Sequence, residues 1–126
     1  MNKRILILDD NRDILDVVTA ALSYERYDVF DIWLGSQLFN SLRDFKPDLV
    51  LLDHRLSDAN GGDLCRQLKA MPQYAHIPVI IFSAYINPGE ALPANCDGYL
   101  YKPFDLDQLF AVVRKLLPAS KTEVSV

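Results

Sequence analysis

The sequence has little cysteine. Among its 126 residues only Cys65 and Cys96 are cysteines, and their spacing fits no metal-binding or redox motif. We therefore expect two reduced thiols. A chain of this length buries about two-thirds of its unfolded surface, so it folds without disulfides or a structural metal.

Long hydrophobic runs are also missing. Apolar stretches such as residues 5–8 and 79–82 have only four residues each, whereas a membrane span needs about 20. The four residues before the first stretch, followed soon by two aspartates, do not make a signal peptide. We expect a cytoplasmic protein that does not contact a membrane.

The chain has no excess of positive charge. It carries 13 basic and 17 acidic residues, for a net charge of −4, which argues against direct binding to nucleic acid. Internal repeats and linkers rich in glycine, serine or proline are absent as well. Half of the residues are apolar and 24% are charged, as in an ordinary folded domain. We expect one domain over residues 1–118 and a flexible tail over 119–126.

Short apolar runs alternate with stretches of helical periodicity. The runs predict five strands, and between or after them apolar residues recur every three or four positions, as on one face of a helix. Ser36 is expected to cap the second helix. This alternation predicts an α/β fold with a doubly wound parallel sheet covered by helices on both faces. The expected strands cover residues 3–8, 27–33, 49–52, 79–82 and 98–101.

Polar residues stand where these strands end. In a doubly wound sheet the carboxyl ends of the strands lie at one edge, where ligands bind. Three converging carboxylates would repel one another unless a hard cation such as Mg²⁺ joined them. A cation, an ammonium group and a hydroxyl around one carboxylate suit phosphoryl transfer, with Asp53 as the nucleophile. The residues concerned are Asp9, Asp10, Asp53, Ser83 and Lys102.

Each of these residues has an ordinary explanation when taken alone. An aspartate pair often forms a turn or helix cap, a strand-end aspartate is common, and a single lysine is usually a solvated surface residue. The occurrence of all of them at the ends of the correct strands is what favours a functional site.

Together the motifs resemble the receiver domain of bacterial two-component response regulators, over about residues 3–117. The resemblance implies a five-stranded sheet in the flavodoxin-like or CheY-like order 2-1-3-4-5. The segments that carry it are residues 5–10, 47–53, 80–84 and 99–104, together with Gly61.

The resemblance also implies a role for each matching residue. Asp53 matches the phosphoacceptor. Asp10 and Asp53 match direct Mg²⁺ ligands, Asp9 matches the acid that holds the metal largely through water, and the backbone carbonyl of Arg55 matches the third protein ligand. Lys102 matches the lysine that pairs with the phosphoryl group, and its bond to Pro103 matches one that is usually cis.

Two further residues match the conformational switch of the family. Ser83 matches the hydroxyl that turns toward the phosphoryl oxygens, and Tyr99 matches the aromatic residue that rotates inward with it. The implied function is to accept a phosphoryl group from a sensor histidine kinase or phosphotransfer protein and then act on an unidentified downstream protein. The chain is thus a signalling phosphoacceptor that assists its own phosphotransfer rather than an enzyme, and a homodimer remains open.

The sequence departs from the family in several places. Ser57 stands where many receivers carry proline, so the loop after Asp53 is expected to be more mobile. The segment between Ser83 and Lys102 is short and contains three residues that disfavour a helix. We therefore expect the fourth helix of the family to be short, displaced or missing. The disfavouring residues are Pro88, Gly89 and Pro93, and bulky residues stand at Arg55 and Tyr85.

Other functions are less consistent with the sequence. Phosphatases of the haloacid dehalogenase type need an acid where Arg55 stands, and a flavin site would not place acidic residues after the first strand. A catalytic role for His54 is disfavoured because the next residue of a strand points to the opposite face. A receiver-like interaction module that is never phosphorylated remains the alternative. Length leaves no room for an output domain after Pro118, so we expect either a stand-alone receiver or a fragment of a longer regulator or hybrid kinase.

Overall fold

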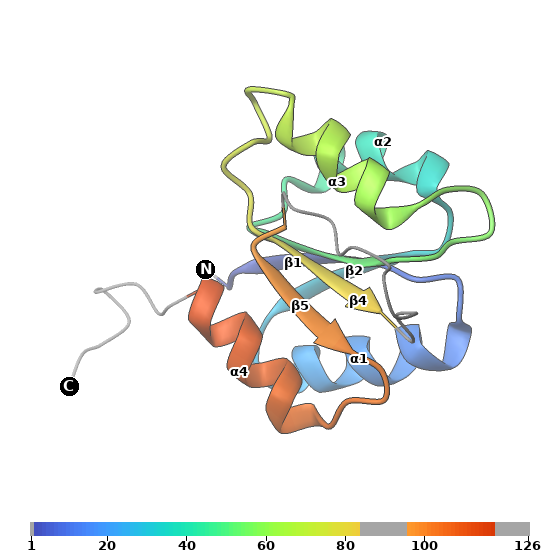
Figure 1. Cartoon of the computed structure of the whole chain (residues 1–126). Helices are drawn as coiled ribbons and strands as arrows, with labels where there is room; N and C mark the ends of the chain where they lie inside the picture. Colours follow the sequence, from blue (N-terminus) through green and yellow to red (C-terminus); the bar gives the residue numbers. More distant parts are fainter. Residues whose placement is uncertain (1, 84–95, 118–126) are drawn as a thin grey trace.

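Five parallel strands form one sheet in the order β2-β1-β3-β4-β5 (Figure 1). The structure is a computed structural model that describes residues 2–83 and 96–117. The strand order and the parallel directions confirm the predicted fold. The strands are β1 (Arg4–Leu8), β2 (Asp28–Ile32), β3 (Leu49–Asp53), β4 (Val79–Ser83) and β5 (Gly98–Tyr101).

Helices cover both faces of the sheet, as predicted. Helices α1 and α4 lie on one face, and α2 and α3 lie on the other (Figure 1). Each face has its own hydrophobic core. The helices are α1 (Arg12–Tyr24), the 3₁₀ helix η1 (Gly35–Gln37), α2 (Leu38–Phe45), α3 (Gly61–Lys69) and α4 (Leu106–Leu116).

The central strands are buried on both sides. All five residues of β3 and of β4 are buried, as are four of the five residues of β1. Side chains that alternate between two covered faces must all be apolar, which is why these strands read as continuous hydrophobic runs. The buried sheet holds the carboxyl ends of its strands in fixed register, and those ends carry the polar residues of interest.

Side chains cap the helices next to that edge. The carboxamide oxygen of Asn11 accepts a hydrogen bond from the backbone N–H of Ile14 and caps α1. The prediction that Ser36 caps the second helix was wrong. The chain enters α2 through η1, and the carboxylate of Asp58 accepts hydrogen bonds from the N–H groups of Gly35 and Ser36. A distant carboxylate thus takes over the role expected of a local hydroxyl.

Some expectations lie outside the described residues. They include the fourth helix of the family, expected between Ser83 and Lys102, and the tail over residues 119–126.

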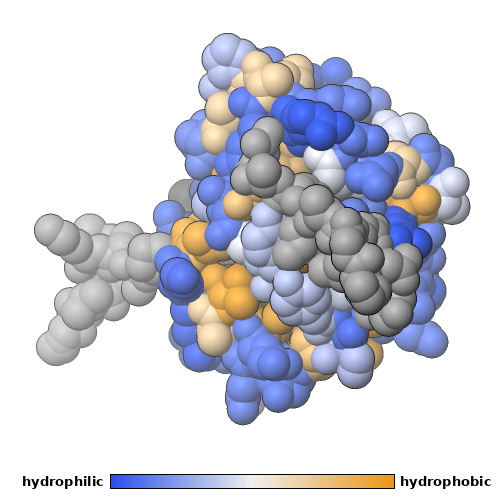
Figure 2. Space-filling model, viewed as in Figure 1, coloured by the Kyte–Doolittle hydropathy of each residue, from blue (hydrophilic) through white to orange (hydrophobic). Residues whose placement is uncertain are grey.

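The bond between Lys102 and Pro103 is cis, as predicted. None of the described helices has the length and apolar character to cross a membrane. The face in Figure 2 carries its hydrophobic side chains in small groups among hydrophilic ones.

Candidate functional site

A pocket of about 320 Å³ opens at the carboxyl ends of the strands. Strands β1, β3 and β4 run parallel, so their last residues and the loops that follow meet at this edge. The structure brings together there all five strand-end residues singled out in the sequence. The pocket is lined by Asp9, Asp10, Asn11, Asp53, His54, Arg55, Ser83 and Lys102.

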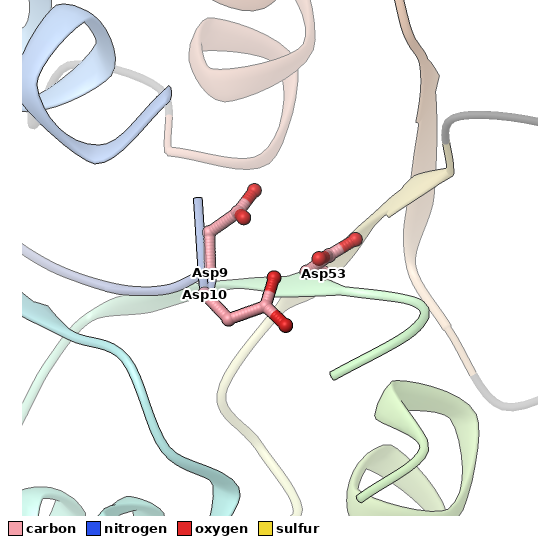
Figure 3. Close-up of side chains that lie close together, drawn as sticks. All are labelled: Asp9, Asp10 and Asp53. Atoms are coloured by element: carbon pink, nitrogen blue, oxygen red, sulfur yellow. The ribbon is translucent and has the colours of Figure 1, made fainter. Parts of the chain in front are cut away.

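Three carboxylates converge in this pocket. Asp9 and Asp10 follow β1, and Asp53 is the last residue of β3 (Figure 3). Each offers an oxygen within 4.8 Å of the others. Asp9 is completely buried and Asp53 is 5% exposed, whereas Asp10 reaches solvent. The cluster therefore concentrates negative charge in a place that water screens poorly.

Lys102 supplies positive charge to the buried pair. Its ammonium group lies 2.8 Å from a carboxylate oxygen of Asp9 and 3.4 Å from one of Asp53. Asp9 also accepts a hydrogen bond of 2.9 Å from the backbone N–H of Asn11. Three carboxylates whose oxygens lie this close together suit a divalent cation with oxygen ligands.

The ionisation of Asp53 reflects this surplus of negative charge. Burial raises the pKa of Asp53 to about 6, the neighbouring carboxylate of Asp9 adds to the rise, and Lys102 opposes it. Asp53 is thus still mostly ionised at neutral pH and can act as a nucleophile or a metal ligand.

This pKa has a consequence for stability. The folded state binds the proton of Asp53 more tightly than the unfolded state does. Protonated Asp53 therefore contributes fully to the free energy of unfolding below about pH 4, and this contribution is lost as the pH rises through 6. We expect Asp53→Asn to raise the free energy of unfolding of the metal-free protein at pH 7 by about 2 kcal/mol. The gain should vanish at pH 4. Urea unfolding at both pH values measures it, and an equal gain at both would contradict the assignment.

The hydroxyl of Ser83 lies in the same pocket without a partner. The side chain is 2% exposed, and its Oγ makes no hydrogen bond within the described part of the chain. A buried hydroxyl normally has a partner, so this one is free to donate to a group that enters the pocket. Tyr99 lies on β5 and packs partly buried against the core on the α2 and α3 side. Burial, and then the neighbouring Cys96, raise the pKa of Tyr99.

Comparison with known proteins identifies the family. The model of the response regulator receiver domain matches residues 5–114. The chain belongs to this family. The DNA-binding response regulator MtrA of Mycolicibacterium smegmatis is 35% identical over 126 residues, which cover 98% of this chain and 54% of that protein. The receiver domain therefore spans about half the length of the curated relatives that it matches.

Solved structures agree with the assignment of the chain to this family. The signal receiver domain of a signal transduction histidine kinase from Syntrophus aciditrophicus is 26% identical, with a TM-score of 0.86 over 98% of this chain and 96% of that one. The chemotaxis response regulator CheY4 of Vibrio cholerae has a TM-score of 0.84 over 92% of this chain and 99% of that one. At 18% identity, the second comparison supports the fold alone.

The loop after the site of this receiver domain is tightly closed. The N–H of Gly61 donates to the carbonyl of His54 at 2.8 Å, and the N–H of Leu56 donates to the carbonyl of Ala59 at 3.0 Å. The carboxylate of Asp58 fastens the loop to η1, as described above. These bonds hold the backbone of Arg55 at the pocket, although Ser57 replaces the proline of many family members.

One feature of the receiver site escaped prediction. Asp58 gave no signal, because its partners are backbone groups more than 20 residues away. His54 is 6% exposed and is among the residues around the pocket. Its backbone N–H donates to the carbonyl of Phe82 at 2.7 Å, so the pairing of β3 with β4 continues through this residue. The Nδ1 atom of His54 has no hydrogen-bond partner among the described residues.

Proposed function

We propose that this receiver domain accepts a phosphoryl group on Asp53 from a histidine kinase or a phosphotransfer protein, with Mg²⁺ as its cofactor. The observation that supports this most strongly is the surroundings of the Asp53 carboxylate. Two further acids lie beside it, and the same pocket holds an ammonium group and a buried hydroxyl that has no partner among residues 2–83 and 96–117. These are the groups needed to bind a cation and to receive a phosphoryl group.

The reaction transfers phosphorus from nitrogen to oxygen. A carboxylate oxygen of Asp53 forms a bond to phosphorus, the bond from phosphorus to the donor's imidazole nitrogen breaks, and the electron pair stays on that nitrogen. Asp53 attacks in its ionised form, and a pKa of about 6 keeps that form dominant at pH 7. Lys102 remains paired with Asp9 and pairs with the new phosphoryl oxygens.

A cation held at this site would neutralise charge that develops on the transferring group. In our proposal Asp10 and Asp53 would hold Mg²⁺ directly, Asp9 would hold it largely through water, and the backbone carbonyl of Arg55 would be the third protein ligand. Three carboxylates whose oxygens lie within 4.8 Å of one another fit the preference of Mg²⁺ for hard oxygen ligands.

The same residues provide a switch. An aspartyl phosphate carries close to two negative charges and three strong acceptors. The Oγ of Ser83 is free to donate to one of them, which would move the end of β4, and Tyr99 on the neighbouring strand would turn inward. We propose that this shift changes the surface seen by a downstream protein. The chain acts as a signalling phosphoacceptor and not as an enzyme with a substrate of its own.

The donor is proposed to be a protein because an apolar groove adjoins the acidic pocket. The groove has a volume of about 540 Å³ and shares Asn11 and Lys102 with the pocket lining. It runs between α1 and the start of α4, where Val17 is 58% exposed and Leu106 is 42% exposed. A phosphohistidine can approach Asp53 while the surrounding helix packs its apolar residues into this groove. We propose a cytoplasmic location for the receiver, because a histidine kinase that donates the phosphoryl group uses the ATP of the cytoplasm.

A substitution in this groove separates docking from chemistry. We expect Val17→Glu to slow transfer from a phosphorylated histidine kinase that serves the wild-type chain by at least about tenfold. Phosphorylation by acetyl phosphate should not change. Tyr24→Glu is the matched control, because Tyr24 lies on the same helix, is 85% exposed and stands outside the groove. Radiolabel transfer measures both, and equal slowing by the two variants would exclude the groove as the docking site.

Intact mass after incubation with acetyl phosphate tests the proposal itself. We expect the wild type to gain about 80 Da with Mg²⁺, and Asp53→Asn to gain nothing. Chelation of Mg²⁺ should also abolish the gain in the wild type. If no gain appears with any donor and calorimetry detects no Mg²⁺ binding, the chain is instead a receiver-like interaction module.

The curated relatives that the chain matches are longer than the chain. The relatives named MtrA are DNA-binding regulators about twice as long as this chain, and this chain covers only the receiver part. We propose residues 1–118 as the receiver domain. Binding to nucleic acid would then belong to other parts of such proteins, and a homodimer remains a candidate partner state.

A further inference from the structure

The two cysteines of the chain meet in space although 30 residues separate them. Cys65 lies on α3 and is fully buried in the core between that helix and the sheet. Cys96 lies two residues before the start of β5 and packs, partly buried, against the same core. Both thiols are reduced.

An ion pair links the two segments that carry the cysteines. Lys69 lies one helical turn after Cys65 on α3, so the two side chains share a face of the helix. The ammonium group of Lys69 lies 2.8 Å from a carboxylate oxygen of Asp97, the residue that follows Cys96. Asp97 is itself fixed to β4, because its N–H donates to the carbonyl of Val79 and its carboxylate accepts from the N–H of Val79.

The thiols also interact directly. A hydrogen bond between them lowers the pKa of Cys65 and raises that of Cys96, and the charge of Lys69 lowers the pKa of Cys65 further. Thiolate character on one sulfur beside a protonated partner is the arrangement from which a disulfide forms. The hydroxyl of Tyr99 is a further hydrogen-bond partner of Cys96.

We propose that Cys65 and Cys96 form a redox-sensitive pair that hydrogen peroxide converts into an intramolecular disulfide. The pair lies between α3 and the start of β5, whereas the acidic pocket lies at the carboxyl ends of the strands. The inference is therefore independent of the proposed phosphorylation.

The oxidation balances in two steps. One thiolate attacks the peroxide, so that a sulfur–oxygen bond forms, the oxygen–oxygen bond breaks and hydroxide leaves to take up a proton. The partner sulfur then attacks the sulfenic acid, its proton leaves with the departing hydroxide as water, and the disulfide forms. Overall, two thiols and one hydrogen peroxide give one disulfide and two waters.

Such a bond would tie α3 to the segment that leads into β5. Cys96 contacts Tyr99, the residue that the family resemblance makes the aromatic switch. If Tyr99 has that role, oxidation would restrain the switch, and this one consequence rests on the proposed function. The disulfide itself does not depend on it.

Mass spectrometry of the full chain under peroxide tests the pair. We expect a loss of about 2 Da that dithiothreitol reverses, and a loss of both iodoacetamide-reactive thiols. A digest without reductant should yield one peptide pair linked through Cys65 and Cys96. Under the same conditions Cys65→Ser and Cys96→Ser should each gain about 16 Da on the remaining cysteine, and neither should lose mass.

Two results would overturn the inference. One is oxidation of the wild type by additions of oxygen alone, with no loss of mass. The other is a disulfide that forms only between two chains, seen as a doubled mass without reductant. Circular dichroism before and after oxidation verifies that the wild type is folded when the bond forms, so a bond made only in unfolded protein would also count against the pair.

Discussion

Replacing Lys102 with methionine is expected to lower the free energy of unfolding at pH 7 by about 3 kcal/mol. The ammonium group of Lys102 pairs with Asp9 and Asp53, both of which are almost fully buried. Methionine keeps much of the apolar stem and removes the charge, so two buried carboxylates face each other without compensation. The same change should slow phosphorylation by acetyl phosphate by roughly a hundredfold, because an ammonium partner of the phosphoryl group is lost.

Proton and metal dependence identify the cause of that instability. The pKa of Asp53, already raised to about 6, should rise further in the variant. The deficit should therefore be largest at neutral pH and should shrink as the pH falls toward 4. Millimolar Mg²⁺ should restore part of the loss at pH 7, since a cation can take the place of the ammonium charge.

Urea unfolding at pH 7 and pH 4, with and without Mg²⁺, measures these effects. Lys115→Met is the matched control, because Lys115 is an exposed lysine on α4. We expect a change within about 0.5 kcal/mol there. If the two variants lost the same stability, or if the deficit of the Lys102 variant were independent of pH, the charge balance described for the pocket would be wrong.

Gly61→Ala is the second change with a large expected effect. A Cβ at this position would lie 2.1 Å from the carbonyl oxygen of Asp53 and 3.1 Å from the Cα of His54. Both are backbone atoms, so relief requires movement of the loop or of the end of β3. We expect a loss of about 3 kcal/mol in the free energy of unfolding. Phosphorylation by acetyl phosphate should fall in parallel, because the loop carries Arg55 and adjoins Asp53.

Gly98→Ala is the control for this change. A Cβ there would meet only side-chain carbons and no backbone atom, the nearest being a methyl carbon of Val112 at 3.3 Å. Such groups can shift, so the cost should stay below about 1 kcal/mol. Thermal unfolding and phosphorylation by acetyl phosphate are measured on both variants. Full activity of Gly61→Ala would show that close approach of the loop to Asp53 is not needed for the chemistry.

The sequence predicts the sheet well because its signals are local. Continuous apolar runs such as that of β3 are required when both faces of a strand are covered, and parallel strands bring their carboxyl ends to one edge. From those two facts the convergence of Asp9, Asp53 and Lys102 follows without any knowledge of contacts. The sequence alone therefore indicates which residues meet at this edge, while their chemical roles remain predictions.

Features that depend on tertiary contacts could not be predicted in this way. Asp58 binds backbone groups of η1, and such partners leave no pattern in the sequence. The meeting of Cys65 and Cys96 likewise depends on how α3 packs beside β5, and the interval between the two cysteines gives no hint of it. The predicted state, two reduced thiols, agrees with the structure, but spacing along the chain says nothing about the distance between the cysteines in space.

The most direct test of the account is to locate the phosphoryl group. The wild-type chain is phosphorylated with acetyl phosphate and Mg²⁺, reduced with borohydride, which converts an aspartyl phosphate into homoserine, and then digested for peptide mass spectrometry. We predict modification of Asp53 in the peptide that contains β3, with Asp9 and Asp10 unchanged. Modification of Asp9, Asp10 or His54 with Asp53 intact would contradict the account.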